Sequence, residues 1–237
     1  GAANTGALIG VTYASIFGCS ASGKVTGTMD TVGGIVGYCG GKIGSSFSTC
    51  DVNGKRLAGG IAGLASMDGS VENCWSSGSV SASEDSAGGI AGGNSNDAVV
   101  KYCYSTVSVS APTYAGGIVG QAQAQVEYCA ALNPSVTGGT NHVATVNATY
   151  GGSISNCYAW DGMAMNGSTA DLPEGVTAIT VTGGTLNHQL SEIFGASEVW
   201  TFEDNKLPGF GVTYDLPDYM TAKPEQIIEI DSADKLA

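Results

Sequence analysis

Seven cysteines are the residues best suited to chemistry in this sequence, because thiolates can bind metal ions, attack electrophiles or form disulfide bonds. No CxxC pair and no cluster of cysteine with histidine occurs, so the spacing predicts no zinc site. Five cysteines share one position of a repeated unit, where another copy has Ser46; they are Cys19, Cys74, Cys103, Cys129 and Cys157. A recurring small side chain predicts a column of buried, free thiols. Cys39 and Cys50 lie outside this column, and a bond between them is left open.

Carboxylates are the second candidate, because glycoside hydrolysis needs two of them about 5–10 Å apart. The first 170 residues hold nine, scattered over different repeat positions: Asp30, Asp51, Asp68, Glu72, Glu84, Asp85, Asp97, Glu127 and Asp161. The only histidines, His142 and His188, form no HExxH motif, and no Ser-His-Asp triad can be assembled from the order of the chain. We therefore predict no catalytic residues, no metal site and no cofactor.

An aromatic side chain often follows the cysteine position, as at Phe47, Trp75, Tyr104 and Tyr158. If the cysteine points inward, the alternation of a strand turns its neighbour outward. Aromatic side chains stacked on an outer face could bind sugar rings or a partner chain. The alternative is that they pack against a loop or against the C-terminal segment.

These positions belong to units of about 27 residues, which the first of three recurring blocks marks most clearly. It reads Gly-Gly-Ile-Val-Gly or Gly-Gly-Ile-Ala-Gly at residues 33–37, 59–63, 88–92 and 116–120, with degenerate copies at 6–10 and 144–148. The second block ends at the cysteine position. The third places a valine six residues later, at Val25, Val52, Val80 and Val109, and one residue further on at Val136. Three blocks in constant order indicate a repeat protein.

Each unit holds three short β-prone pieces, too few to bury an apolar face alone. Stacking units about 4.8 Å apart would pair every strand with its neighbours. We therefore predict an all-β fold, a right-handed, single-stranded parallel β-helix over residues 1–165. Its inward column should be Leu8, Ile35, Ile61, Ile90 and Ile118.

A corner is expected just before the cysteine position, because Val71 and Cys74 can both point inward only if the chain turns between them. Gly18, Asn73 and Asn156 occupy this corner and tolerate a left-handed backbone. Tyr102 and Tyr128 occupy it in other units and do not fit the pattern.

The charge distribution separates the C-terminal part of the 237-residue chain from the repeats. The net charge is −13, which argues against nucleic acid as a partner, and residues 171–237 carry twelve acidic and three basic side chains. The apolar runs are far shorter than the roughly 20 residues that cross a bilayer, so no membrane insertion is predicted, and no signal peptide is visible. We expect residues 166–237 to form an acidic, irregular, β-rich cap over the open end of the helix.

The blocks Gly-Gly-Ile-Ala-Gly and Val-x-Asn-Cys-Trp resemble the GLUG motif, most closely at residues 58–82. The resemblance covers residues 6 to about 160. It implies an exported, β-helical bacterial protein at the cell surface, often with many repeats, and transfers no catalytic residues. The last stretch, Ile227–Leu236, resembles the start of a further repeat region.

Three functions follow as hypotheses. The first is an adhesin-like binding or scaffold module that presents a rigid face to a glycan or to a host or bacterial surface protein. The second is a carbohydrate-active enzyme, a polysaccharide lyase or a glycosidase, on the same fold. The third is a spacer without a ligand inside a larger surface protein or peptidase.

Overall fold

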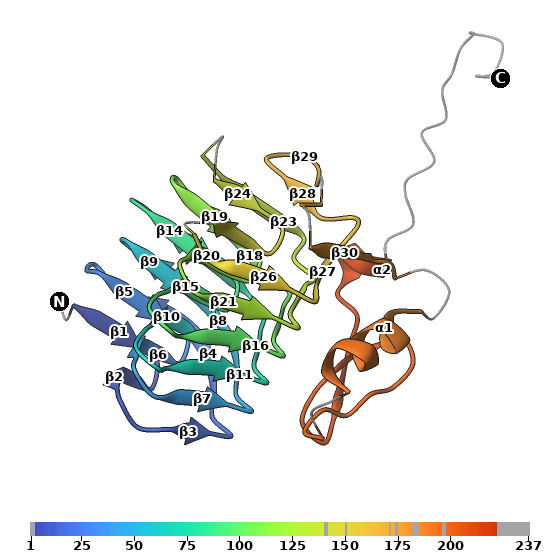
Figure 1. The fold of residues 1–237 in the computed structure, drawn as a ribbon, viewed down its shortest axis with the longest axis horizontal. Helices are drawn as coiled ribbons and strands as arrows, with labels where there is room; N and C mark the ends of the chain where they lie inside the picture. Colours follow the sequence, from blue (N-terminus) through green and yellow to red (C-terminus); the bar gives the residue numbers. More distant parts are fainter. Residues whose placement is uncertain are drawn as a thin grey trace, which may run out of the picture.

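A computed structural model describes residues 3–139, 142–149, 151–170, 172–173, 175–181, 185–195 and 198–221. It confirms a parallel β-solenoid: short strands stack in register through about six coils, which begin at β1, β5, β9, β14, β19 and β24 (Figure 1). Within the described residues, no helix is long and apolar enough to span a lipid bilayer.

Three sheets each take one strand from every coil. The first contains β1 (Asn4–Gly6), β5 (Thr31–Gly33), β9 (Leu57–Gly59), β14 (Ser86–Gly88), β19 (Tyr114–Gly116) and β24 (Val143–Ala144). The second contains β2 (Ile9–Thr12), β6 (Val36–Cys39), β10 (Ala62–Ala65), β15 (Ala91–Asn94), β20 (Val119–Ala122) and β25 (Asn147–Thr149). The third contains β3 (Ile16–Phe17), β7 (Lys42–Gly44), β11 (Ser70–Glu72), β16 (Val99–Lys101), β21 (Gln125–Glu127) and β26 (Ser153–Ser155).

The fourth sheet is larger, because it covers the remaining side of every coil. In the first two coils this side is one long strand, β4 (Ser20–Thr26) and β8 (Phe47–Gly54). Later coils split it into two short strands, which are β12 (Trp75–Ser76), β13 (Ser79–Ala82), β17 (Tyr104–Ser105), β18 (Ser108–Ala111), β22 (Ala130–Ala131), β23 (Ser135–Gly138), β27 (Cys157–Trp160) and β28 (Ala164–Met165). A complete coil thus has four or five strands where the sequence predicted three pieces, because the glycine block turns the chain between the first two sheets.

The register follows the repeat. Val25, Val52, Val80, Val109 and Val136 pair in succession, including the last one with its extra preceding residue. Gly116 pairs with Ala144, which aligns residues 144–148 with the earlier glycine blocks; the register then slips by one residue after Val119.

The glycine block is a steric requirement of the coil-to-coil distance. A Cβ on Gly60 would lie 2.1 Å from the carbonyl oxygen of Gly89 in the next coil and 2.7 Å from the Cβ of Ser76. The Ser76 hydroxyl donates a hydrogen bond to the same Gly89 oxygen at 2.6 Å. Only glycine permits this approach of two backbones and a buried hydroxyl.

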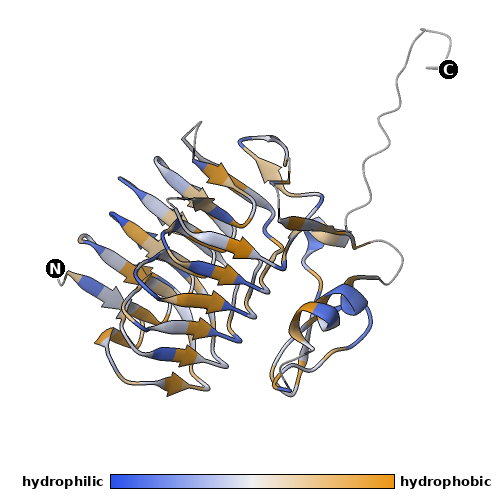
Figure 2. Cartoon of the chain, in the orientation of Figure 1, coloured by the Kyte–Doolittle hydropathy of each residue, from blue (hydrophilic) through white to orange (hydrophobic). Residues whose placement is uncertain are grey.

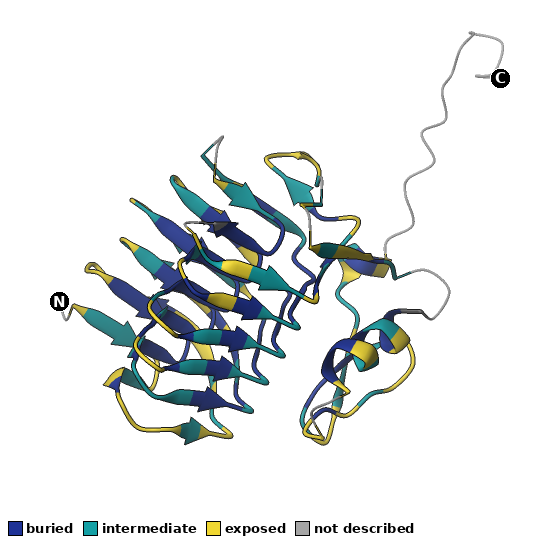
Figure 3. Cartoon of the chain, in the orientation of Figure 1, coloured by how far each residue is buried: buried dark blue, intermediate teal, exposed yellow. Residues whose placement is uncertain are grey.

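The core lies inside the coils and is densest in the middle of the stack (Figure 3). Apolar segments recur at matching places in successive strands (Figure 2). Ile35, Ile61, Ile90 and Ile118 are fully buried, whereas the predicted first member of this column, Leu8, is 50% exposed. Leu8 keeps its register, since its N–H donates to the Ile35 oxygen, but its coil is at the edge of the described stack, where no described coil covers its outer side.

The C-terminal residues differ from the predicted end cap. A short hairpin, β28 with β29 (Ser168–Thr169), leads to β30 (Val176–Ile179), which extends the fourth sheet beyond the last coil by pairing with β27. The chain then forms α1 (Thr185–Phe194), the hairpin β31 (Lys206–Pro208) with β32 (Thr213–Asp215), and α2 (Asp218–Thr221).

We call residues 185–195 and 198–221 the C-terminal cap. It lies beside the stack rather than across its end (Figure 1), and it contains a helix that the sequence analysis did not predict. The predicted lead-in at Ile227–Leu236 lies outside the described residues.

Replacement Gly60→Ala is expected to lower the free energy of unfolding by about 3 kcal/mol, the upper range for overpacking, because the next coil must move away from the new methyl group. The urea midpoint followed by circular dichroism measures it. Gly93→Ala is the control: its Cβ would meet the Gln121 oxygen at 3.3 Å, and we expect at most a small change. Equal midpoints for the two variants would contradict the steric account.

Candidate functional site

The corner before the cysteine column has a left-handed backbone in every coil. The φ angles are 63° at Gly18, 47° at Ser45, 50° at Asn73, 54° at Tyr102, 49° at Tyr128 and 50° at Asn156. The tyrosines thus adopt the conformation that their type disfavours, because the stacked coils impose it. Their rings stack at 5.2 Å, which offsets part of the cost of about 1–2 kcal/mol for each residue.

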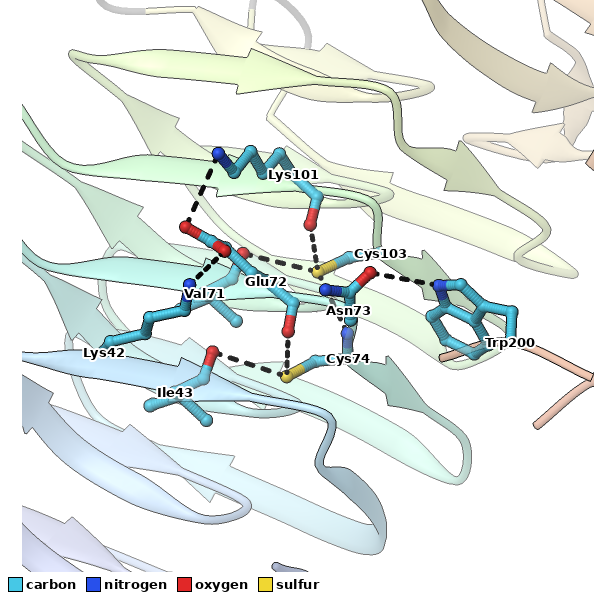
Figure 4. Close-up of polar contacts among 9 residues, drawn as sticks. All are labelled: Lys42, Ile43, Val71, Glu72, Asn73, Cys74, Lys101, Cys103 and Trp200. Carbon is cyan, nitrogen blue, oxygen red and sulfur yellow. Dashed lines mark hydrogen bonds and ion pairs between the residues drawn. The ribbon is translucent and has the colours of Figure 1, made fainter. Parts of the chain in front are cut away.

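All seven cysteines are free, and the column sits directly after this corner. Cys74, Cys103, Cys129 and Cys157 are fully buried, and Cys19 in the first coil is half-buried. The thiols of Cys74 and Cys103 contact the carbonyl oxygens two residues earlier, each at 3.2 Å (Figure 4). Burial raises the pKa of the Cys103 thiol well above its ordinary value, and raises that of Cys39 outside the column to about 11. The Cys103 and Cys39 thiols are therefore protonated packing elements.

The aromatic residues after the column form a continuous stack of three rings. Phe47 and Trp75 are parallel within 1° at 4.6 Å between centroids, and Trp75 and Tyr104 within 2° at 5.8 Å. Tyr158 is separated from them because Ala130 occupies the coil between. We call Phe47, Trp75 and Tyr104 the ring stack.

The ring stack faces away from the solenoid core, but the C-terminal cap covers it. Trp75 is 5% exposed and Tyr104 fully buried, and both belong to a second apolar cluster built with the cap. Trp200 packs on Tyr104 at 5.6 Å, Tyr214 packs on Trp75 at 4.7 Å, and the Tyr104 hydroxyl donates to the Pro208 oxygen at 2.7 Å. The open platform for sugar rings is therefore occupied by the chain's own residues, as in the packing alternative.

Polar contacts hold the cap in register with particular coils. The Trp200 indole N–H donates to the side-chain oxygen of Asn73, 3.2 Å away at the left-handed corner (Figure 4). The Tyr219 hydroxyl donates to the Leu132 oxygen at 2.6 Å, two coils further on. The cap thus contacts successive coils along one side of the stack.

Glu72 lies between two lysines from neighbouring coils (Figure 4). It forms a short ion pair with Lys42 and a second one with Lys101 at 3.5 Å. Burial alone would raise the pKa of this carboxyl, but the hydrogen bonds from Lys42 and Ser70 and the charge of Lys101 outweigh it and lower the pKa. This arrangement stabilises a stack of coils and leaves Glu72 ionised, so it is unsuited to donate a proton.

Other candidate groups are similarly engaged. Arg56 pairs with Asp30 at 3.2 Å, and Lys55 pairs with Glu84 at 3.3 Å, each between adjacent coils. His188 faces Glu192 on the exposed side of α1. Across the described ranges, no three His, Cys, Asp or Glu side chains gather as a metal site would require.

A cavity of about 330 Å³ remains between the ring stack and the cap. The solenoid wall consists of the ring stack and a row of hydroxyl side chains two residues further on: Thr49, Ser77 and Thr106. The cap wall consists of Leu207, Tyr214, Asp215 and Pro217. Trp75 lines the cavity, and its buried indole N–H has no hydrogen-bond acceptor among the described residues.

Most residues that line this cavity were not among the site residues predicted from the sequence. A signal existed for Thr49, Ser77 and Thr106, because a hydroxyl residue recurs two positions after each residue of the ring stack. No periodic signal existed for Tyr214 or Asp215, since the cap does not repeat.

The geometry defines the class of protein: a β-solenoid repeat protein with a laterally docked C-terminal cap.

Comparison with known families gives a match to the profile described as the GLUG motif at residues 84–110, so the chain carries the repeat that its sequence indicated. The fold is similar to the crystal structure of a proposed immunoglobulin A1 protease from Bacteroides ovatus. That match has 24% identity and a TM-score of 0.62, and it covers 83% of this chain and 74% of the other. Comparison with curated proteins gave no match.

Replacement Glu72→Gln should destabilise the solenoid at pH 7 and much less near pH 3. A carboxyl whose pKa is lowered on folding adds stability above its unfolded value of about 4.3, and this stability is lost as the pH falls through the lower folded pKa. The measurement is the melting temperature of both proteins across that range. Glu84→Gln, at an exposed pair, is the control with little expected effect. A constant difference at all pH values would refute the assignment.

Replacement Asn73→Gly should loosen the cap by about 1 kcal/mol while leaving the corner intact, because glycine accepts the left-handed backbone but removes the acceptor for Trp200. Hydrogen exchange of residues 198–221 reports the loosening. Asn156→Gly makes the same change at the corresponding corner of the last coil and should leave cap exchange unchanged. Equal effects would show that the contact with Trp200 contributes nothing.

Proposed function

We propose that the chain is an adhesin-like binding or scaffold module of a bacterial cell-surface protein, which holds a rigid solenoid against a glycan or a protein partner. The observation that supports it is the cavity between the ring stack and the cap. Concave sites lined by aromatic side chains and a few polar groups are the usual form of a ligand site. The GLUG resemblance supports the location at the surface.

The solenoid supplies rigidity for such a role. Coil-to-coil backbone hydrogen bonds run through the stack, and the coils fix the positions of the cavity wall from Thr49 to Thr106. The similar protein from Bacteroides ovatus is named for action on immunoglobulin A1. A host protein as a partner would be consistent with that name, whereas a peptidase activity would need groups other than the engaged ones described above.

A spacer is the second candidate. Its support is that the recurring columns of the repeat are used in packing: isoleucines and thiols inside, the ring stack under the cap. No observation favours the carbohydrate-active enzyme. The repeat carboxylates of Asp30, Glu72 and Glu84 form ion pairs with arginine or lysine.

The purified chain, probed on a glycan array and on a panel of extracellular-matrix proteins and immunoglobulins, should bind at least one of these. Replacement Ser77→Phe, which fills the cavity, should weaken this binding at least tenfold. Ser110→Phe places the same ring on an exposed strand position and should not change it. Absence of binding to every probe would favour the spacer.

A further inference from the structure

We infer that the cavity receives an extended, positively charged segment of a partner polypeptide, with an aromatic side chain inserted beside the ring stack and Tyr214. The inference rests on the proposed binding function and names the chemistry of its ligand. Three features of the cavity point to it: the orientation of its rings, its charge and its length.

The central ring of the stack, Trp75, offers its edge and not its faces. Because Phe47, Trp75 and Tyr104 are parallel within 1–2°, the faces of Trp75 are covered by its two neighbours. Sugars bind aromatic side chains through ring faces, so the stack is poorly suited to a pyranose. Ring edges carry partial positive charge and attract the face of another aromatic ring in a tilted arrangement. Tyr214 already packs in this way, tilted by 56° against Trp75.

The charge of the cap selects a basic partner. Residues 185–221 contain six carboxylates and one lysine. Asp215 stands at the exposed rim of the cavity, and Asp218 follows the cavity residue Pro217. A lysine or arginine that flanks the inserted ring would meet this acidic rim, as complementary interfaces do.

The length of the wall suits an extended chain. Thr49, Ser77 and Thr106 come from three successive coils, and coils about 4.8 Å apart place the outer two about 10 Å from each other. This span equals about three residues of extended polypeptide. The Thr49 and Ser77 hydroxyls offer donors and acceptors along it, and the Thr106 hydroxyl, which donates to the Ser76 oxygen, offers an acceptor.

The test uses the complete chain and two tripeptides, Ac-Lys-Trp-Lys-amide and Ac-Glu-Trp-Glu-amide, with tryptamine and methyl β-galactoside as further probes. Binding is measured by ligand-observed NMR and by calorimetry. The basic peptide should bind most tightly, and the acidic peptide at least about fivefold more weakly. Replacement Asp215→Asn, at an exposed position where folding is not at risk, should weaken the basic peptide about threefold. Asp204→Asn removes the same charge elsewhere in the cap and should have no effect.

Ser77→Phe should abolish binding of the basic peptide, and Ser110→Phe should leave it unchanged. Equal affinities for the two peptides would overturn the inference that charge selects the partner. An affinity for tryptamine equal to that for the basic peptide would show that the ligand is a small molecule and not a polypeptide. Binding of methyl β-galactoside in preference to both peptides would overturn the inference in favour of a glycan. If a partner from the array or protein panel binds Ser77→Phe as tightly as the unchanged protein, the chain has a binding function but this cavity is not its site.

Discussion

The approach of neighbouring backbones at the glycine block is the constraint on which the rest of the structure depends. At Gly60 a single methyl group would meet the next coil at 2.1 Å, so each coil can seat on its neighbour in one register only. A shift by one residue would place a side chain in this contact and turn every inward residue outward. The repeated sequence therefore fixes the register between neighbouring coils as well as the apolar side chains of the core.

Alignment then converts positions in a repeat into physical columns. Glu72 lies between two lysines because its unit and its neighbours are in register, and the thiols contact equivalent carbonyl oxygens for the same reason. The left-handed corner shows the strength of the constraint. Tyr102 and Tyr128 adopt it although tyrosine disfavours it, so the stack decides the local conformation and the side chains accommodate it.

The periodic part of the molecule could be predicted from sequence, and the aperiodic part could not. The recurrence of Ile35, Cys74 and Val80 indicated the columns and their order, because a column needs only a period. The exposed Leu8 shows where this reasoning ends, since a period carries no information about which coil is terminal. The cap lacks a period altogether, so neither its helix nor the contacts of Trp200 and Tyr214 could be predicted. An outward ring stack was inferred correctly from strand alternation, but its cover lies more than 90 residues away along the chain.

The docking of the cap along several coils has a consequence for how such an array can change in evolution. Repeat arrays commonly grow or shrink by whole units, because each unit contacts only its neighbours. Here the cap touches the third coil at Asn73, the fourth at Tyr104, the fifth at Leu132 and the last at Trp160. Duplicating or deleting a coil within this span would separate contacts that one short segment must make together. The cap therefore fixes the number of coils between Asn73 and Trp160.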